Sequence, residues 1–227
     1  MAYKRTIAPR KLARGEDLTQ AMAGIGMRFT ANPVKNPNIE DTLIAASIEG
    51  MEHDDRRVLS VLVTWIQVHY PRINADRLTR AVSLLTESEQ LERVKAFWAA
   101  IGEWLKKDRR FARMAKLYSG PRIDVLAVGT DFHIGRKGED LRFINTSIRV
   151  PADVLRERES DVVTPSELAR IHSVYRQRIL MGPTYRADMW SALKDAPSLS
   201  VAELARQTYG SFATAWQVKE EFGILAA

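Results

Sequence analysis

The sequence predicts a mainly α-helical protein, with a bundle-like N-terminal helical domain that carries one β-hairpin and a second, C-terminal helical domain. Three observations support this class. Apolar residues recur three and four positions apart through most of residues 38–118, which is the period of a helix. Helix-capping patterns precede new apolar runs at several places along the chain. Only residues 123–150 depart from the helical period in a way that is typical of strands.

The composition is that of an ordinary globular chain. Its 227 residues are 45% apolar, which fits one large domain or two small ones. Cysteine is absent, which excludes a disulfide framework, a cysteine-ligated metal site and a cysteine nucleophile. No apolar run approaches the ~20 residues that a membrane span needs, and residues 1–14 lack the apolar run of a secretory signal. We therefore expect a soluble cytoplasmic protein.

Residues 1–37 show no sustained periodicity and contain glycines and Asn-Pro pairs that are typical of turns. We expect this region to be a basic arm with an irregular lead-in. The stretch before Glu16 carries basic side chains and no acidic ones. Such an arm is able to reach into the minor groove of DNA. Its candidate contact residues are Lys4, Arg5, Arg10 and Lys11.

Residues 38–155 are expected to form the first domain, whose helices are marked by caps and apolar stripes. The strongest stripe runs from Leu91 to Leu105 at spacings of three and four residues. The expected helices begin at Asn38, at about Asp54, at Asn74 and at about Leu91, and a short fifth helix covers Arg110–Tyr118.

A β-hairpin is expected within this domain at about residues 123–150. Residues 123–128 have a β-like apolar pattern, and residues 141–150 are expected to form the returning strand. The glycine-containing stretch between them would form the tip, in the way that a wing projects from a winged helix. Arg136 and Lys137 lie at this tip, so we expect them to contact DNA phosphates.

A charged connector at residues 156–161 is the expected boundary to the second domain, residues 162–227. Thr164 and Glu167 form a capping box, which predicts a helix that continues to about Leu180.

A second capping box, formed by Ser200 and Glu203, predicts a helix that ends at Tyr209. Gly210 then turns the chain, and Ser211 caps a last helix. This arrangement predicts a pair of helices joined by a tight turn at the end of the chain.

The apolar residues of this pair follow a known pattern. Leu204 and Ala205 lie at the core of the first helix, Gly210 lies in the turn, and the second helix turns Phe212, Ala215, Val218 and Phe222 back toward the first. Residues 199–223 therefore resemble the helix-turn-helix and winged-helix superfamily of DNA-binding proteins, although Gly210 lies one position later than the usual turn glycine. The resemblance implies that the last helix enters a groove, where we expect Ser211, Thr214 and Gln217 to reach base edges.

Basic residues are concentrated in the middle of the chain. The net charge is +6, and residues 101–150 alone carry eleven bases against six acids, a surplus of five. This clustering favours a polyanionic partner. The expected phosphate contacts in this region are Lys106, Lys107, Arg109, Arg110, Arg113 and Lys116.

No catalytic or cofactor-binding motif is present. The four histidines lack metal-ligand spacing, and the chain has no HExxH, P-loop or GxGxxG pattern. Asp131 and His133 are the most site-like pair, because one strand would place both side chains on the same face, where they are able to bind a metal or serve in catalysis. We nevertheless expect a protein that is not an enzyme and that has no cofactor and no metal site.

Together these observations predict a non-enzymatic protein that binds duplex DNA mainly through its phosphates. A bacterial-type transcription regulator, or the DNA-binding component of a toxin–antitoxin or phage-defence operon, is expected by fold-level analogy. In the operon case a protein partner encoded beside it is also expected. Two alternatives remain open: an α-helical adaptor that docks onto a protein in a multiprotein complex, and a protein that binds RNA through the same basic surface.

Overall fold

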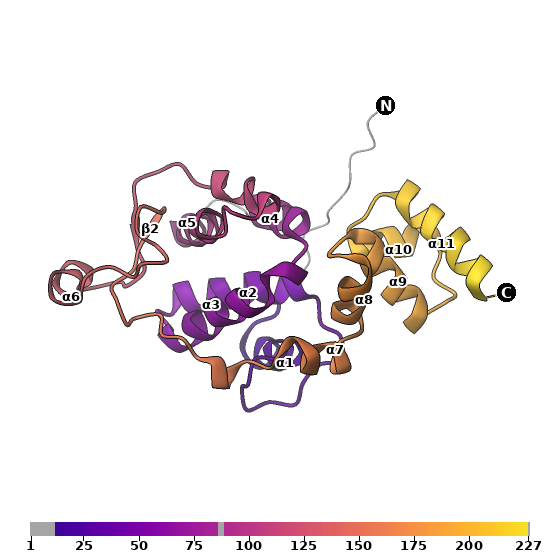
Figure 1. Cartoon of the computed structure of the whole chain (residues 1–227), viewed down its shortest axis with the longest axis horizontal. Coiled ribbons are helices and arrows are strands. Elements are labelled where there is room, and N and C mark those ends of the chain that lie inside the picture. The colour runs from indigo at the N-terminus through magenta and orange to yellow at the C-terminus, as the bar shows by residue number, and fades with distance from the viewer. Residues whose placement is uncertain (1–11, 86–88, 227) are drawn as a thin grey trace.

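The structure, a computed structural model, describes residues 12–85 and 89–226. It confirms the mainly helical class, because helices make up most of this range and its named strands form one two-stranded sheet. The molecule is elongated, with α6 (Thr130–Lys137) at one end and α11 (Phe212–Ala226) at the other (Figure 1). None of the helices in the described range combines the length and the apolar character that a bilayer crossing requires.

The elements follow one another along the chain as Figure 1 labels them. The first are α1 (Gly15–Gly24), α2 (Ile39–Glu52), α3 (Arg56–His69), η1 (Tyr70–Arg72), α4 (Ala75–Ser83), α5 (Glu89–Trp104), η2 (Arg109–Phe111) and η3 (Met114–Lys116), where η denotes a 3₁₀ helix. Then follow β1 (Ile123–Asp124), α6, β2 (Ile148–Arg149), η4 (Glu159–Asp161), α7 (Pro165–Ile171), α8 (Ser173–Met181), α9 (Tyr185–Asp195), α10 (Val201–Thr208) and α11.

Side-chain caps begin four of these helices where the sequence predicts them. Asn38 and Asn74 each accept a hydrogen bond from a backbone N–H in the first turn of α2 and α4. Thr164 and Ser200 both form complete capping boxes at the starts of α7 and α10. Local capping chemistry therefore sets these four helix starts.

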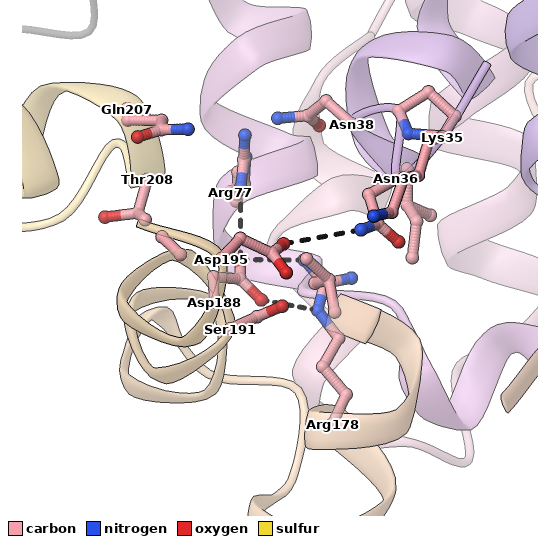
Figure 2. A pocket seen from close by; sticks show the side chains of 14 residues that line it. Lys35, Asn36, Asn38, Arg77, Arg178, Asp188, Ser191, Asp195, Gln207 and Thr208 are labelled. Carbon is pink, nitrogen blue, oxygen red and sulfur yellow. Dashed lines mark hydrogen bonds and ion pairs between the residues drawn. The ribbon is translucent and has the colours of Figure 1, made fainter. Parts of the chain in front are cut away.

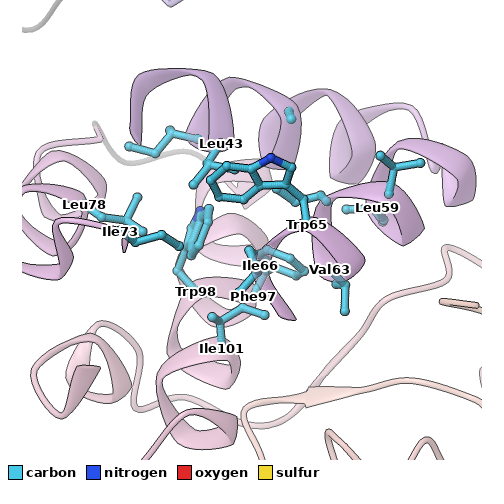
Figure 3. Packing of buried hydrophobic residues seen from close by; sticks show 14 of the residues in the cluster. Leu43, Leu59, Val63, Trp65, Ile66, Ile73, Leu78, Phe97, Trp98 and Ile101 are labelled. Atoms are coloured by element: carbon cyan, nitrogen blue, oxygen red, sulfur yellow. The ribbon is translucent and has the colours of Figure 1, made fainter. Parts of the chain in front are cut away.

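We call the part of the chain that shares the large hydrophobic core the first body; it includes α1–α5, α7, α8 and the small sheet. Trp65 and Trp98 are fully buried in this core among side chains from α2, α3 and α5 (Figure 3). The Trp65 indole N–H donates to the Ile25 carbonyl at 2.7 Å, and that of Trp98 donates to Ser47 Oγ at 2.9 Å. Both rings therefore bury a large apolar area without leaving a polar atom unpaired.

The lead-in is not irregular throughout, because residues 15–24 form α1. Leu18 and Met22 lie one helical turn apart and are both buried in the core of the first body. The helix was missed because it is short and its apolar face has only a few residues, so tertiary packing stabilises it more than any sequence period indicates. Gly24 is required where α1 ends, since a Cβ there would lie 2.4 Å from the Val34 carbonyl oxygen.

The predicted β-hairpin at about 123–150 is wrong. β1 and β2 are only two residues long each, and they pair in parallel rather than as the arms of a hairpin. The expected tip is the helix α6, which lies between Gly129 and Gly138, both with left-handed φ values of 83° and 79°. Gly129 directly precedes α6 and Gly138 directly follows it, so the two glycines flank a short helix instead of forming a hairpin turn. Asp131 and His133 consequently lie on a helix and not on one face of a strand.

The predicted helix at Arg110–Tyr118 is replaced by the two short turns η2 and η3. Phe111 and Met114 are three residues apart, and both are fully buried. A 3₁₀ helix has three residues per turn, so this spacing directs both side chains to the same side, toward the core.

The predicted helix from Thr164 to about Leu180 breaks at His172 into α7 and α8. His172 has an extended backbone, and its Nδ1 accepts a hydrogen bond from the Tyr175 N–H, so the imidazole ring caps α8. The same ring donates from Nε2 to the Pro37 carbonyl at 2.9 Å. The His172 ring at the break therefore connects the start of α8 to the loop before α2.

A second, smaller core lies between α9, α10 and α11, which we call the second body. Its fully buried members are Met189, Leu193, Leu204, Ala215 and Val218. By contrast, α7 and α8 supply Leu168 and Tyr175 to the core of the first body. The change from one core to the other therefore falls between α8 and α9, and the two-domain division at residues 156–161 stays a prediction.

A buried ion-pair network joins the two bodies. The Arg178 guanidinium on α8 binds both oxygens of Glu40 on α2, at 2.6 and 2.9 Å, and both oxygens of Asp188 on α9, at 2.7 and 2.8 Å. Arg77 on α4 adds a hydrogen bond to Asp188 at 3.1 Å. Burial raises the pKa of Glu40, but the charges and hydrogen bonds of Arg178 and the charge of Arg77 outweigh it and hold that pKa below its usual value.

We expect Arg178→Met to lower the free energy of unfolding by about 3–5 kcal/mol, because it leaves two buried carboxylates without their main counter-charge. Urea unfolding followed by circular dichroism measures this value. Arg176→Met, an exposed position on the same helix, is the matched control and should change the free energy by less than about 0.5 kcal/mol. Equal effects of the two substitutions would contradict a structural role for the network.

Two buried histidines predict that the protein loses stability in mild acid. His69 Nε2 donates to the Val163 carbonyl at 3.0 Å, and its Nδ1 accepts from the Tyr175 hydroxyl at 2.7 Å. Burial lowers the pKa of both His69 and His172 from 6.5 to about 4. The unfolded chain therefore takes up protons that the folded chain excludes, so stability is full above pH 6.5 and falls as the pH drops toward 4, by up to about 3 kcal/mol per histidine.

The measurement is the free energy of unfolding in urea at several pH values in this window. His172→Asn keeps an acceptor for the Tyr175 N–H but has no titrating ring. It should therefore reduce the slope of the unfolding free energy against pH by up to about 1.4 kcal/mol per pH unit. His53→Asn removes an exposed imidazole and should keep the steep slope. If His172→Asn also keeps the wild-type slope, His172 is not the group that titrates.

Candidate nucleic-acid interface

The turn between α10 and α11 has a left-handed residue at Tyr209, with φ of 59°. Tyr209 stands one position before Gly210, which is the position of the usual turn glycine in the helix-turn-helix pattern. Gly210 meets a different need, because a Cβ there would lie 2.2 Å from Met189 Cε. The left-handed residue of this turn is therefore a tyrosine, and the end of the Met189 side chain on α9 packs against Gly210.

Tyr209 fixes this turn to the first body. Its ring is buried, its hydroxyl donates to Asp41 Oδ2 on α2 at 3.0 Å, and the Arg77 guanidinium lies over the ring at 4.3 Å from its centre. A tyrosine in the left-handed region costs about 1–2 kcal/mol of conformational energy. The aromatic and hydrogen-bonding contacts offset that cost and place α11 in a defined position.

The three residues expected to reach base edges differ in their roles. Ser211 Oγ accepts from the Thr214 N–H at 3.1 Å and shares a 2.7 Å hydrogen bond with the Thr214 hydroxyl, so Ser211 caps α11 and both side chains are only partly exposed. Gln217 is exposed, and its amide donates to Glu221 Oε1 at 3.1 Å. Of the three, Gln217 is the side chain most open to a ligand.

Two aromatic side chains beside Gln217 are also exposed. Trp216 is 55% exposed, and Phe212, which the helix-turn-helix pattern places in the core, is 44% exposed. The expectation for Phe212 is therefore wrong, because Ala215 and Val218 fill the space against α10 without it. The apolar spacing of α11 does not reveal this, since it cannot distinguish a core residue from one at the edge of the stripe.

The basic segment, residues 106–116, divides into two groups. Within the described part of the chain, four exposed cations form no side-chain ion pair, namely Lys106, Lys107, Arg109 and Lys116. Arg110 instead pairs with Asp108 at 2.6 Å and donates to the Pro71 and Ile73 carbonyls. Arg113 lies 3.5 Å from Asp76 but remains 77% exposed. Arg110 thus stabilises the segment, and the other side chains are available to a polyanion.

The structure brings the basic segment close to the start of α11. Asp76 on α4 contacts Arg113 and also accepts a hydrogen bond from the Tyr185 hydroxyl at 2.9 Å. Tyr185 Cβ in turn lies 3.7 Å from the position that a Cβ would take at Gly210. Figure 1 shows α4 on the side of the first body that faces α9–α11. A few side chains therefore separate the basic segment from the turn before α11.

Arg136 and Lys137 do not belong to the same surface. They lie in the last turn of α6, at the far end of the molecule from α11 (Figure 1). Lys137 pairs with Asp153 at 3.3 Å, and Arg136 lies over the Phe132 ring. The prediction that they lie at the tip of a hairpin is wrong, because residues 130–137 form a helix, and their contact with DNA phosphates stays a prediction.

Other candidate positions contribute little to a site. Lys4, Arg5, Arg10 and Lys11 lie outside the described residues. Asp131 forms an ion pair with Arg149, and no cluster of three or more His, Asp or Glu able to hold a metal ion occurs in the part of the chain that the structure describes. Comparisons of the chain with protein-family models, with curated proteins and with solved structures found no match.

A close helix contact determines where the basic segment lies. A Cβ at Gly102 on α5 would lie 2.4 Å from the Ala115 backbone nitrogen in η3. We expect Gly102→Ala to lower the free energy of unfolding by about 1–3 kcal/mol, because backbone cannot move aside as a flexible side chain does.

The matched control is Gly135→Ala on α6, where no atom lies within 4 Å of an added Cβ. It should raise stability by about 0.5–1 kcal/mol, since alanine restricts the unfolded chain. Thermal unfolding of both variants gives the comparison. A Gly102→Ala protein as stable as the Gly135→Ala protein would show that η3 does not pack against α5 in this way.

Proposed function

We propose that this protein is a non-enzymatic, cytoplasmic duplex-DNA-binding protein, in which α11 enters a groove and the basic segment holds phosphates. The observation that carries the proposal is the short series of contacts, from Arg113 through Asp76 to Tyr185, that links the basic segment to the turn before α11. By analogy of fold alone, the setting would be a bacterial-type transcription regulator or the DNA-binding component of a toxin–antitoxin or phage-defence operon.

In the proposed complex, some side chains contact phosphates and others contact bases. Lysine and arginine side chains that neutralise phosphates supply most of the affinity and make it dependent on salt. Lys106, Lys107 and Arg109 are exposed and suited to this role. On α11, the Gln217 amide is able to bond adenine, and the exposed Trp216 ring is able to contact a sugar or a thymine methyl group.

We expect fluorescence-anisotropy titrations with random-sequence duplex DNA to show affinity that falls steeply between about 50 and 200 mM salt. The double variant Lys106→Ala/Lys107→Ala should weaken binding at the lower salt by at least about tenfold and reduce the salt slope by about two. Arg136→Ala/Lys137→Ala removes the same charge from α6 at the far end of the molecule and should leave binding near that of the wild type.

Three outcomes would contradict the proposal. Equal weakening by both pairs would show that net charge and not this surface attracts DNA. Absence of binding at 50 mM salt would exclude the DNA function. Preference for single strands or for A-form duplex in the same assay would favour RNA.

A protein-docking function is the second candidate, and one groove favours it. The groove has a volume of about 500 Å³ and lies between α8, α9 and α11. Leu180 and Leu225 line it and are 72% and 77% exposed, together with Trp190 and Phe222. A partner that buries such apolar surface would bind with little dependence on salt, which distinguishes this function from DNA binding.

A further inference from the structure

The polar pocket at the junction of the two bodies has balanced charges. Its volume is about 420 Å³, and its charged lining residues are Lys35, Arg77, Arg178, Asp188 and Asp195 (Figure 2). Both arginines bind Asp188, and Arg178 also binds the carboxylate of Glu40. Cations and carboxylates are therefore equal in number here, so this pocket does not indicate an ion as its ligand.

A second pocket differs from the first in its charge. It has a volume of about 260 Å³ and lies where the start of α3, the end of α6 and the loop after β2 meet. We call it the arginine pocket, because five cations line it, namely Arg56, Arg57, Lys137, Arg156 and Arg158. Among its lining residues, Asp153 has the only carboxylate. The arginine pocket therefore holds an excess of positive charge.

Hydrogen bonds hold the three parts of the arginine pocket together. The Ala152 N–H donates to the Gly138 carbonyl at 3.0 Å, which joins the loop to the end of α6. Further along the same loop, the Arg158 N–H donates to Thr64 Oγ1 on α3 at 3.0 Å. The backbone segments that carry the five cations are therefore fixed relative to one another, and their charges stay close together without a ligand.

Two ion pairs use part of this charge. Lys137 pairs with Asp153 at 3.3 Å, and Arg158 pairs at 3.2 Å with Asp161, which itself lies outside the pocket. Both pairs lie at the protein surface, where an ion pair contributes little and its partners are readily shared with a ligand.

The other three cations, Arg56, Arg57 and Arg156, are exposed and form no ion pair within the described residues. Two carboxylates are their neighbours in sequence, but neither lines the pocket. Asp55 caps α3 by accepting from two backbone N–H groups of its first turn, and Glu157 accepts from a glutamine amide on α3 at 3.3 Å. Three guanidinium groups therefore remain without a counter-charge at the pocket.

Two contacts position these guanidinium groups without neutralising them. Arg57 lies over the Phe29 ring at 5.3 Å from its centre, and Arg156 Nε donates to the Asp153 carbonyl at 3.1 Å. A guanidinium has five N–H donors in a planar fork, which matches the oxygens of a phosphate or a carboxylate. Exposed donors and positive charge are therefore concentrated in one small region.

We propose that the arginine pocket binds a small anion that carries one or two phosphate groups. A phosphate group has about two negative charges near pH 7 and three acceptor oxygens, so it is able to bind several of these cations at once. The pocket is slightly smaller than the ~300 Å³ at which pockets for drug-sized ligands begin, which favours a compact anion over a whole nucleotide. It lies toward the end of the molecule that carries α6 (Figure 1). The site does not depend on the proposed DNA function.

The test is equilibrium dialysis against radiolabelled inorganic pyrophosphate at constant ionic strength. Arg56→Glu reverses a charge of the pocket at the first residue of α3, where the helix dipole favours an acidic side chain, so this variant should fold. Arg176→Glu makes the same change at an exposed position on α8, outside the pocket. We expect Arg56→Glu to bind pyrophosphate at least about tenfold more weakly than the wild type and Arg176→Glu. Arg156→Ala, which removes a cation from the loop, should weaken binding to a similar extent.

Absence of binding by the wild type at millimolar pyrophosphate would overturn the proposal. Equal weakening by Arg56→Glu and Arg176→Glu would also overturn it, because net charge would then attract the anion. A titration with duplex DNA distinguishes a free anion from a backbone phosphate. If Arg56→Glu weakens DNA binding as strongly as Lys106→Ala/Lys107→Ala, the pocket holds a DNA phosphate and the small-anion assignment fails. If the wild type does not bind DNA, the proposed function fails, and the pyrophosphate measurement still tests the arginine pocket.

Discussion

Arg178 binds two carboxylates from different helices in the interior of the protein, and the relative position of the two bodies depends on this interaction. Removing an arginine, a glutamate and an aspartate from water is costly, and the cost is offset only when all of the charges meet in good geometry. Glu40 on α2 and Asp188 on α9 satisfy that condition together. An arrangement that moved α9 away from α2 would leave buried charges unpaired, so few alternative placements of the second body are accessible.

The geometry of the candidate interface depends on this junction between the two bodies. Arg77 binds Asp188 and also stacks on Tyr209, so the ion-pair network extends to the turn before α11. The neighbouring residue on α4, Asp76, contacts both Arg113 and Tyr185. The basic segment and the last helix come from distant parts of the sequence, yet α4 holds both at fixed positions.

Local patterns predicted much of the secondary structure and little of the site. The caps at Asn38 and Ser200 could be recognised because a cap and its helix are adjacent in sequence. The hairpin prediction failed because glycines such as Gly129 and Gly138 fit a turn between strands as well as they fit the ends of a short helix. The ion-pair network left no sequence pattern, since 138 residues separate Glu40 from Arg178.

Tyr209 has a consequence for how the last helix is able to move. Glycine at a turn lets the backbone change its angle freely, whereas this turn has a side chain that is held by Asp41 and Arg77 on two other helices. A rotation of α11 about the turn would pull the ring from that place. Any change in the angle between α10 and α11 is therefore mechanically coupled to the contacts that hold the second body against the first. The helix angle and the position of the second body cannot vary independently.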